Sequence, residues 1–376
     1  MERDFQIIEG LDWPSDVCRA WRELSDENPN ANYAQTFQWN RACIERLGFR
    51  AESVLLIVAR LGKQIEAVFP FIVEVQRQLG LNVRVLHLPR HLHIDLHDVA
   101  VRPGIEHTEL MSDLFGFLKA SRGVPCDVIE FGKVLETSAV YKLLSGESTV
   151  RSSLVPRRVC NCLPVMSEDQ LRKYVSRNMR ANLRKAHKVL DGYHRVRFLT
   201  TRDPESLSRC FEQFMEVEAS GWKGANGTGT AILLDTKLQA FYRQLLETFG
   251  QNGRCEINQL QIDGRIAAAQ FALIAGKTLY LLKIGYDQDF VEVAPGQLLL
   301  AHTVSRLHAE GEIETINLIT DAAWHDRWRP AELTVYEASC FGNSLHGAMV
   351  YAHRRLRVEL GEWRRSVKSI AKRGGA

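Results

Sequence analysis

Residues 255–286, CEINQLQIDGRIAAAQFALIAGKTLYLLKIGY, contain the pattern that decides the fold. Short dipeptides, Asp263-Gly264 and Ala275-Gly276, interrupt an otherwise strand-like stretch. Two-residue connections of this kind are typical of tight hairpin turns. The stretch therefore predicts an antiparallel meander of three strands, at 255–262, 265–274 and 277–286.

Segments with helical periodicity surround this meander. We expect helices at 168–190, 204–219, 234–249 and 297–310, and a strand at 315–320. The first half repeats the order with strands at 53–61, 64–75, 83–88 and 126–132 and helices at 35–47 and 107–120. The shared order favours duplication of one α/β unit, although two unrelated meanders would give a similar pattern.

Length and composition set the class of protein. A chain of 376 residues with 45% hydrophobic and 25% charged residues is expected to form two globular domains. The polar stretch 146–158 marks the boundary, which gives domains at 1–155 and 156–376. The N-terminus lacks the pattern of a secretory signal and the eight cysteines are scattered, so we expect reduced thiols and a cytoplasmic location. The net charge of +3 does not by itself indicate DNA or RNA binding.

Several stretches resemble a known family. In the second half they are YVSRNMRANLRKAHKVLDGY (174–193), CFEQFMEVEASGWKG (210–224), LQIDGRIAAAQFALIAGKTLYLLKIGYDQDF (260–290) and APGQLLLAHTVSRLHAEG (294–311). In the first half they are QTFQWNRACIERLG (35–48), IVARLGKQIEAVFPFIVE (57–74) and CDVIEFGKVLETSAVYKLL (126–144). They are similar to the BioF2-like branch of the GNAT acetyltransferases, which is related to the Fem-type ligases that add amino acids to peptidoglycan precursors. Many members occur in bacterial exopolysaccharide or cellulose biosynthesis.

The resemblance implies an α/β fold of tandem GNAT-like domains, each a mixed, mostly antiparallel sheet flanked by helices. It also implies an N-acyltransferase whose amine acceptor attacks an acyl-CoA thioester directly. Acetyl-CoA or a longer acyl-CoA is then the donor, and the acceptor is a small molecule or a cell-envelope or polysaccharide precursor. Two alternatives stay open: a Fem-like transferase that uses aminoacyl-tRNA, and a binding module that kept the fold without catalysis.

The first candidate site begins the helix at 297–310. Pro295, Gly296, Gln297 and Leu298 form a strand-to-helix junction. Free backbone N–H groups and the helix dipole make such a helix start suitable for a phosphate, so these residues are candidates for coenzyme A binding. An ordinary helix start would have the same sequence.

The second candidate site is the glycine-rich loop GWKGANGTGT (221–230) and the helix end before it. Glu216 and Glu218 are candidates for the base that deprotonates the amine. Trp222 and Lys223 at the loop entry are candidates for substrate contact, because a mobile loop can close over a substrate. A flexible connection preceded by solvated carboxylates is the alternative.

The third candidate site follows the strand at 315–320. Asp321 and His325 are candidates for catalysis and Trp324 for substrate binding. The family often has a Tyr-Lys pair here, and Trp324-His325 replaces it, so a different handling of substrate is implied. A surface histidine beside tryptophans is the alternative.

A histidine-rich stretch and two basic helices complete the candidates. In LHLPRHLHIDLHDV (86–99), a strand would place His91, His93, Asp95 and His97 on one face, but four residues in a line cannot surround one ion, so we expect no metal. The resemblance implies instead that this stretch, with His97, lines an interdomain cleft, because it matches a cleft-side segment of the family's first half. The helix at 168–190 and the C-terminal segment 354–373 are basic. Packing against the protein itself, contact with an anionic membrane surface and contact with tRNA are the alternatives for these helices.

Overall fold

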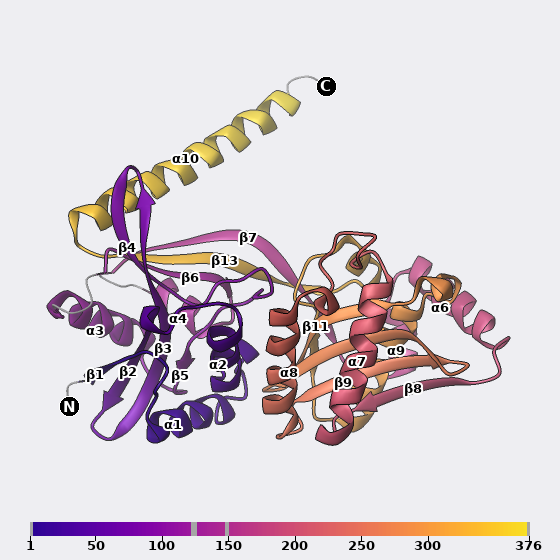
Figure 1. Cartoon of the computed structure of the whole chain (residues 1–376). Helices are drawn as coiled ribbons and strands as arrows, with labels where there is room; N and C mark the ends of the chain where they lie inside the picture. The colour runs from indigo at the N-terminus through magenta and orange to yellow at the C-terminus, as the bar shows by residue number, and fades with distance from the viewer. Residues whose placement is uncertain (1–2, 122–125, 147–149, 374–376) are drawn as a thin grey trace.

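The computed structural model describes residues 3–121, 126–146 and 150–373. Within these residues, 13 strands form one continuous sheet, which runs through two groups of helices (Figure 1). The order along the main path is β1-β2-β3-β4-β6-β13-β7-β12-β11-β10-β9-β8. Pairs of neighbours are antiparallel except β4·β6 and β11·β12, so the predicted mixed and mostly antiparallel α/β fold is confirmed.

The first half follows the predicted order of elements. It contains β1 (Arg3–Glu9), α1 (Ser15–Asp26), α2 (Phe37–Arg46), β2 (Val54–Leu61), β3 (Gln64–Gln78), β4 (Leu81–His87), β5 (Ala100–Val101), α3 (His107–Ala120), β6 (Val128–Leu135) and α4 (Ala139–Ser145). One face of its sheet packs on α3 and α4, and the other packs on α1 and α2.

The second half repeats this order around the predicted meander. It contains β7 (Arg151–Pro164), α5 (Glu168–Tyr174), α6 (Arg177–Leu190), β8 (Val196–Thr201), α7 (Pro204–Ser220), α8 (Thr236–Gly250), β9 (Cys255–Ile262), β10 (Arg265–Ala275), β11 (Thr278–Tyr286), α9 (Pro295–Glu310), β12 (Thr315–Asn317), β13 (Ala331–Phe341) and α10 (Leu345–Arg373). Phe271 and Leu273 of β10 face α7 and α8, whereas Ala272 faces the α9 side, as the period of two in a strand requires.

Two long strands join the halves. β7 pairs with β12 of the second half at its end, and with β13 along most of its length. β13 returns to pair with β6 of the first half (Figure 1). The expected domain boundary after residue 155 lies inside β7, and residues 147–149 of the polar stretch lie outside the described residues. The division into domains 1–155 and 156–376 stays a prediction.

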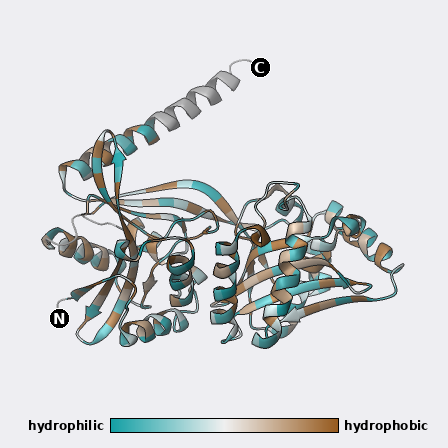
Figure 2. Ribbon diagram, viewed as in Figure 1, coloured by the Kyte–Doolittle hydropathy of each residue, from teal (hydrophilic) through white to brown (hydrophobic). Residues whose placement is uncertain are grey.

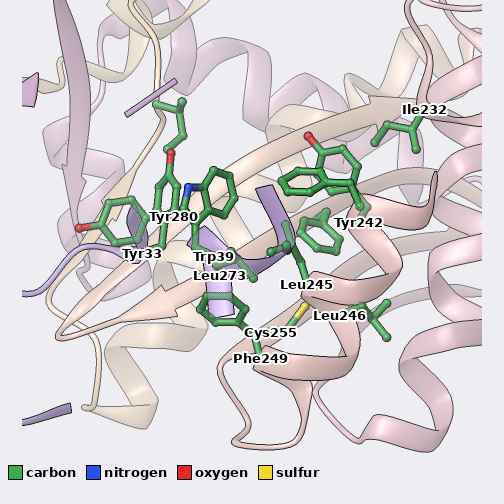
Figure 3. Packing of buried hydrophobic residues seen from close by; sticks show 14 of the residues in the cluster. Tyr33, Trp39, Ile232, Tyr242, Leu245, Leu246, Phe249, Cys255, Leu273 and Tyr280 are labelled. Atoms are coloured by element: carbon green, nitrogen blue, oxygen red, sulfur yellow. The ribbon is translucent and has the colours of Figure 1, made fainter. Parts of the chain in front are cut away.

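A shared hydrophobic core lies between the halves. Tyr33 and Trp39 of the first half pack against the second half (Figure 3). The ring of Tyr33 lies 5.0 Å from that of Tyr280, and the ring of Trp39 lies 5.5 Å from that of Phe241, measured between centroids. In the hydropathy view, brown apolar ribbon concentrates in the strands of both halves, whereas the outer helices are mixed (Figure 2). This packing holds helix α2 of the first half against helix α8 of the second, and Tyr33 against β11.

Three sequence expectations are corrected. The helix expected at 168–190 is two helices, because Ser176 caps α6 through the Met179 N–H and donates its own N–H to Arg327 O. The polar stretch, for which no strand was expected, belongs to strand β7 from Arg151 onward, because residues 151–162 pair with β13. The histidine-rich stretch is irregular between residues 88 and 99, so its alternate residues do not share a strand face.

Candidate functional site

The second half contains an opening between two parallel strands. β11 and β12 pair only at Thr278–Tyr280, and β12 ends at Asn317. Beyond Tyr280, β11 therefore has no strand partner on this side among the residues that the structure describes. A cavity of about 140 Å³ lies at this opening. It is lined by Asp95, Lys223, Leu281, Leu282, Lys283, Ile284, Leu318, Ile319, Thr320, Trp324 and His325. We call it the splay cavity.

A strained turn opens the splay cavity. Ile319 has a φ of 66°, and the Thr320 N–H donates to Leu318 O at 2.7 Å. A positive φ is a true outlier for a β-branched residue and costs on the order of 1–3 kcal/mol. Asn317 Oδ1 accepts the Ile319 N–H at 2.8 Å, and Arg158 donates to Ile319 O at 2.7 Å, so the surrounding contacts hold the turn. The turn carries the chain away from β11.

The first half contributes a carboxylate to the splay cavity. Asp95 belongs to the irregular segment between β4 and β5, and its side chain is 27% exposed. Its carboxylate lies 3.8 Å from Arg158 and 3.9 Å from Lys133, and Arg158 also donates to Asp95 O. These cations hold Asp95 in place without a close hydrogen bond to the carboxylate. Sequence reasoning named Asp95 only as one of the alternating residues of the histidine-rich stretch and gave it no role of its own, since about half the chain separates it from β11.

Two lysines face the same space. Lys223 Nζ donates to Glu218 Oε1 at 2.7 Å and to Ile284 O at 3.2 Å. Lys283 makes no hydrogen bond or ion pair with any residue that the structure describes. Burial lowers the pKa of Lys283, and Lys223 lowers it further, whereas Asp95 and Glu218 raise it. Lys283 was missed, because one lysine in an apolar strand gives no signal in the sequence.

The two candidate glutamates lie in different environments. Glu218 is only 3% exposed, and its second oxygen accepts the Ile232 N–H at 3.0 Å. It therefore connects the end of α7 to both sides of the glycine-rich loop. Glu216 is exposed and bonds to no described residue. The helix end also approaches β11 closely, since a Cβ on Gly285 would lie 2.8 Å from the Cα of Glu218.

The glycine-rich loop folds onto itself. Thr228 N–H donates to Trp222 O, and Ala231 N–H donates to Lys223 O. Trp222 is 60% exposed, so its ring is available to a substrate but does not line the splay cavity. Lys223 does line the cavity, and its contact with a substrate stays a prediction.

The residues after β12 lie in the 3₁₀ helix η5 (Ala323–Trp328) and just before it. Trp324 and His325 both line the splay cavity. His325 is 1% exposed, burial lowers its pKa, and its Nδ1 lies 3.0 Å from the amide nitrogen of Asn161. Asp321 is exposed at the entry to η5.

His97 does not line the splay cavity. Its Nδ1 accepts the Lys133 N–H, and its Nε2 contacts Pro89 O.

The start of α9 leaves little free backbone. Gln297 N–H and Leu298 N–H both donate to Ala294 O, and Pro295 has no N–H. Of these four residues, Gly296 alone therefore has a backbone N–H with no acceptor among the described residues. The Gln297 side chain accepts the indole N–H of Trp328 at 2.7 Å. The helix start alone is a weak phosphate site.

A second and larger hollow lies beside α9. It measures about 960 Å³ and lies between α5, α6, β8 and α9, with Leu171, Leu183 and Leu298 among its apolar lining. Its cations are Arg172, Lys173, Arg177, Arg180, Arg184 and Lys188. Of these, only Arg172 forms an ion pair with a described residue. We call this hollow the α6–α9 groove.

The splay cavity lies at the carboxyl ends of two parallel strands. β11 and β12 are parallel, so both carboxyl ends point to one edge of the sheet, and α9 starts at that edge after β11. In sheets with parallel strands, ligands commonly bind at such an edge. Among the described residues, no group of three His, Cys, Asp or Glu side chains is placed to hold a metal ion. Nor is any described helix long and apolar enough to cross a membrane.

Comparison with solved structures supports the fold. A crystal structure of FemX superposes with a TM-score of 0.57 and 12% identity, covering 89% of this chain and 97% of that one. The C-terminal domain of a putative lysylphosphatidylglycerol synthetase from Agrobacterium fabrum superposes with a TM-score of 0.51 and 11% identity, covering 90% of this chain and 96% of that one. L-PGS from Bacillus licheniformis superposes with a TM-score of 0.51 and 12% identity, covering 92% of this chain and 98% of that one. At these identities the likeness shows a shared fold alone.

Comparison with protein families locates the family signature. No curated protein matches the chain. Residues 177–328 match the family model described as an acetyltransferase (GNAT) domain. The match begins at α6 and ends with η5. It therefore contains β11 and β12, which form two sides of the splay cavity, and the whole of α9. Over residues 177–328, this chain is therefore similar to the GNAT acetyltransferase family.

Proposed function

We propose that the protein transfers an acyl group from acyl-CoA to an amine acceptor in the splay cavity. The observation that carries the proposal is the opening between β11 and β12 beside the start of α9. There, among the described residues, the edge of β11 is free of a strand partner from Leu281 onward. Backbone groups on such an edge can bind an extended donor and stabilise the oxyanion of a tetrahedral intermediate.

The α6–α9 groove supplies the charge that the start of α9 lacks. Coenzyme A is polyanionic, and a single free N–H at Gly296 does not neutralise it. Arg177, Arg180, Arg184 and Lys188 lie along α6 across the groove from α9 and have no ion-pair partner among the described residues. We propose that these cations bind the phosphates and that the acyl end reaches the splay cavity.

Within the cavity we assign three roles. Asp95, the carboxylate that lines the cavity, accepts a proton from the amine as its nitrogen forms a bond to the thioester carbonyl carbon. The carbon–sulfur bond then breaks and coenzyme A leaves as a thiolate, which is protonated by solvent, and Asp95 returns its proton to solvent. Glu218 and Lys223 position the glycine-rich loop and the β11 edge. Trp324 and His325 form the opposite wall, where they contact the acceptor. Direct attack needs no acyl-enzyme, so the buried cysteines have no role in the chemistry.

An aminoacyl-tRNA donor is the second candidate. The observation that favours it is the same row of unpartnered arginines, which suits an RNA backbone as well as a coenzyme. The two donors differ in salt dependence: a nucleic acid that contacts many phosphates loses affinity steeply as salt rises.

The test is turnover with defined donors. Purified protein is incubated with acetyl-CoA or a long-chain acyl-CoA and a panel of amines, and the acylated amines are detected by mass spectrometry. Asp95→Asn should lower turnover by about 10²-fold or more with little change in donor affinity. Glu136→Gln, in the turn after β6, is the control. Turnover with aminoacyl-tRNA alone would replace the acyl-CoA proposal.

A further inference from the structure

Lys283 is the feature of the splay cavity that the proposed reaction leaves unexplained. It lies on β11 at the free edge, lines the cavity and is partly buried. No described residue gives it a hydrogen bond or an ion pair. A charge removed from water without a partner is costly, so such a lysine is expected to bind an anion or to lose its proton.

The other ionisable groups near Lys283 either have charged partners or carry no charge. Lys223 is paired with Glu218 at 2.7 Å, and the Glu218 side chain is buried. Asp95 is held between Arg158 and Lys133. His93 carries no charge at neutral pH, because burial lowers its pKa to about 3. Among the described residues that line the cavity, the ammonium of Lys283 is therefore the charge without a partner.

The charge pattern selects the acceptor. A simple ammonium ion would enter a cavity whose unpaired charge is the ammonium of Lys283, and that ammonium would repel it. An acceptor that carries a carboxylate beside its amine would instead pair with Lys283, while its amine faces Asp95. The cavity volume of about 140 Å³ suits a small amino acid rather than a large oligosaccharide.

We propose that the acceptor is an amino acid or a related amine with a nearby carboxylate, and that Lys283 binds that carboxylate. The kinetic test of this inference rests on the proposed acyltransferase activity, whereas the binding of a carboxylate to Lys283 does not depend on that activity. Lys283 is the specificity-determining residue, and Asp95 is the group that receives the amine proton.

A kinetic comparison tests the pairing. Glycine, alanine and glutamate are offered as free acids and as carboxamides, with acetyl-CoA as donor. The wild type should prefer the acids by about tenfold or more in kcat/KM, since a charge-assisted hydrogen bond of this kind contributes about 1.5–3 kcal/mol. Lys283→Met should lose the preference, and Lys283→Arg should keep it. Lys277→Met, at the exposed turn before β11, is the matched control.

A second readout does not depend on turnover. Amino acids without donor should raise the thermal midpoint of the wild type and of Lys277→Met, but not that of Lys283→Met, and the carboxamides should raise none of them. If Lys283 instead stabilised the oxyanion, Lys283→Met would lower kcat equally for acids and amides, which would overturn the inference. Equal use of acids and amides by the wild type would also overturn it while leaving the acyltransferase intact. Binding of acids through Lys283 without any acyl transfer would show that the proposed function fails and the carboxylate site stands.

Discussion

Glu216 and Glu218 are two residues apart on α7, yet the structure gives them different environments. The sequence offers both as bases because it shows only two carboxylates at a helix end. Burial separates them: Glu218 is 3% exposed and bonded through both oxygens, whereas Glu216 is exposed. A helical period places residues two positions apart on different faces, so the pattern could have indicated that one was inward.

The pair gives a matched test at the residue scale. Glu218→Gln should lower the free energy of unfolding by about 2–3 kcal/mol, because it leaves Lys223 without its counter-charge. Glu216→Gln should change it by less than about 0.5 kcal/mol. Urea unfolding of the two variants measures both values. Equal stabilities would contradict the role of Glu218 as the residue that holds the loop.

Gly296 tests the donor site without a packing conflict. A Cβ at this position would meet no atom within 4 Å, so the side chain is tolerated. Gly296→Glu should weaken acetyl-CoA binding by about tenfold or more, because it places a negative charge beside the bound phosphates. Gly296→Ala should bind as the wild type does. Equilibrium dialysis with acetyl-CoA measures the affinities, and unchanged binding to Gly296→Glu would remove the α9 start from the donor site.

At the scale of elements, regular patterns were predictable and local exceptions were not. The meander at 255–286 and the helix at 107–120 follow the sequence expectation closely, because strong periodicity and tight turns define them. The break at Ser176 and the strand β7 were missed. The break depends on a bond to Arg327 far along the chain, and β7 depends on pairing with β13. Such contacts are tertiary, so local sequence does not report them.

The segment between β4 and β5 shows what irregular structure contributes. Its turns place Asp95 in the splay cavity and direct His97 into the protein, where both ring nitrogens are occupied. The sequence suggested that this stretch lines a cleft, and Asp95 rather than His97 lines the splay cavity. A regular strand would have kept Asp95 and His97 on one face.

His97 predicts a pH dependence for this segment. Burial lowers its pKa to about 3, against about 6.5 in an unfolded chain. The unfolded chain therefore binds a proton that the folded protein does not, and stability present above the unfolded pKa is lost as the pH falls toward the folded pKa. Through His97, the free energy of unfolding should fall by about 1.4 kcal/mol between about pH 7 and about pH 5.5.

Urea unfolding at several pH values checks this effect. His97→Gln removes the titrating group, so its stability should fall less steeply over the same range. Parallel pH profiles for the wild type and the variant would contradict the assignment.

At the scale of the whole molecule, the halves depend on each other. β13 lies between β6 and β7, and Tyr33 and Trp39 complete the core beside α8 (Figure 3). The sequence indicated two similar units but not that their sheets are continuous. For the same reason the splay cavity draws Asp95 from one half and Lys283 from the other, a combination that no local motif reveals.

This continuity predicts the behaviour of fragments. Residues 1–155 expressed alone lack β13, so β6 would have an open edge and the shared core would be exposed. The fragment should show no cooperative unfolding transition, and it should associate. Circular dichroism during urea unfolding and analytical ultracentrifugation test both points. A monomeric fragment that unfolds cooperatively would show instead that residues 1–155 are an independent domain.

The central claim is that an acyl-CoA donor binds with its phosphates in the α6–α9 groove and its acyl group at the splay cavity. Calorimetric titration with acetyl-CoA, at moderate salt, tests it most directly in three proteins. These are the wild type, the Arg180→Ala/Arg184→Ala variant and Lys185→Ala, whose exposed lysine lies on α6 outside the groove lining. We predict saturable binding by the wild type and Lys185→Ala, and affinity at least about tenfold lower for the double variant. No saturable binding by the wild type, or equal affinity in all three proteins, would contradict the claim.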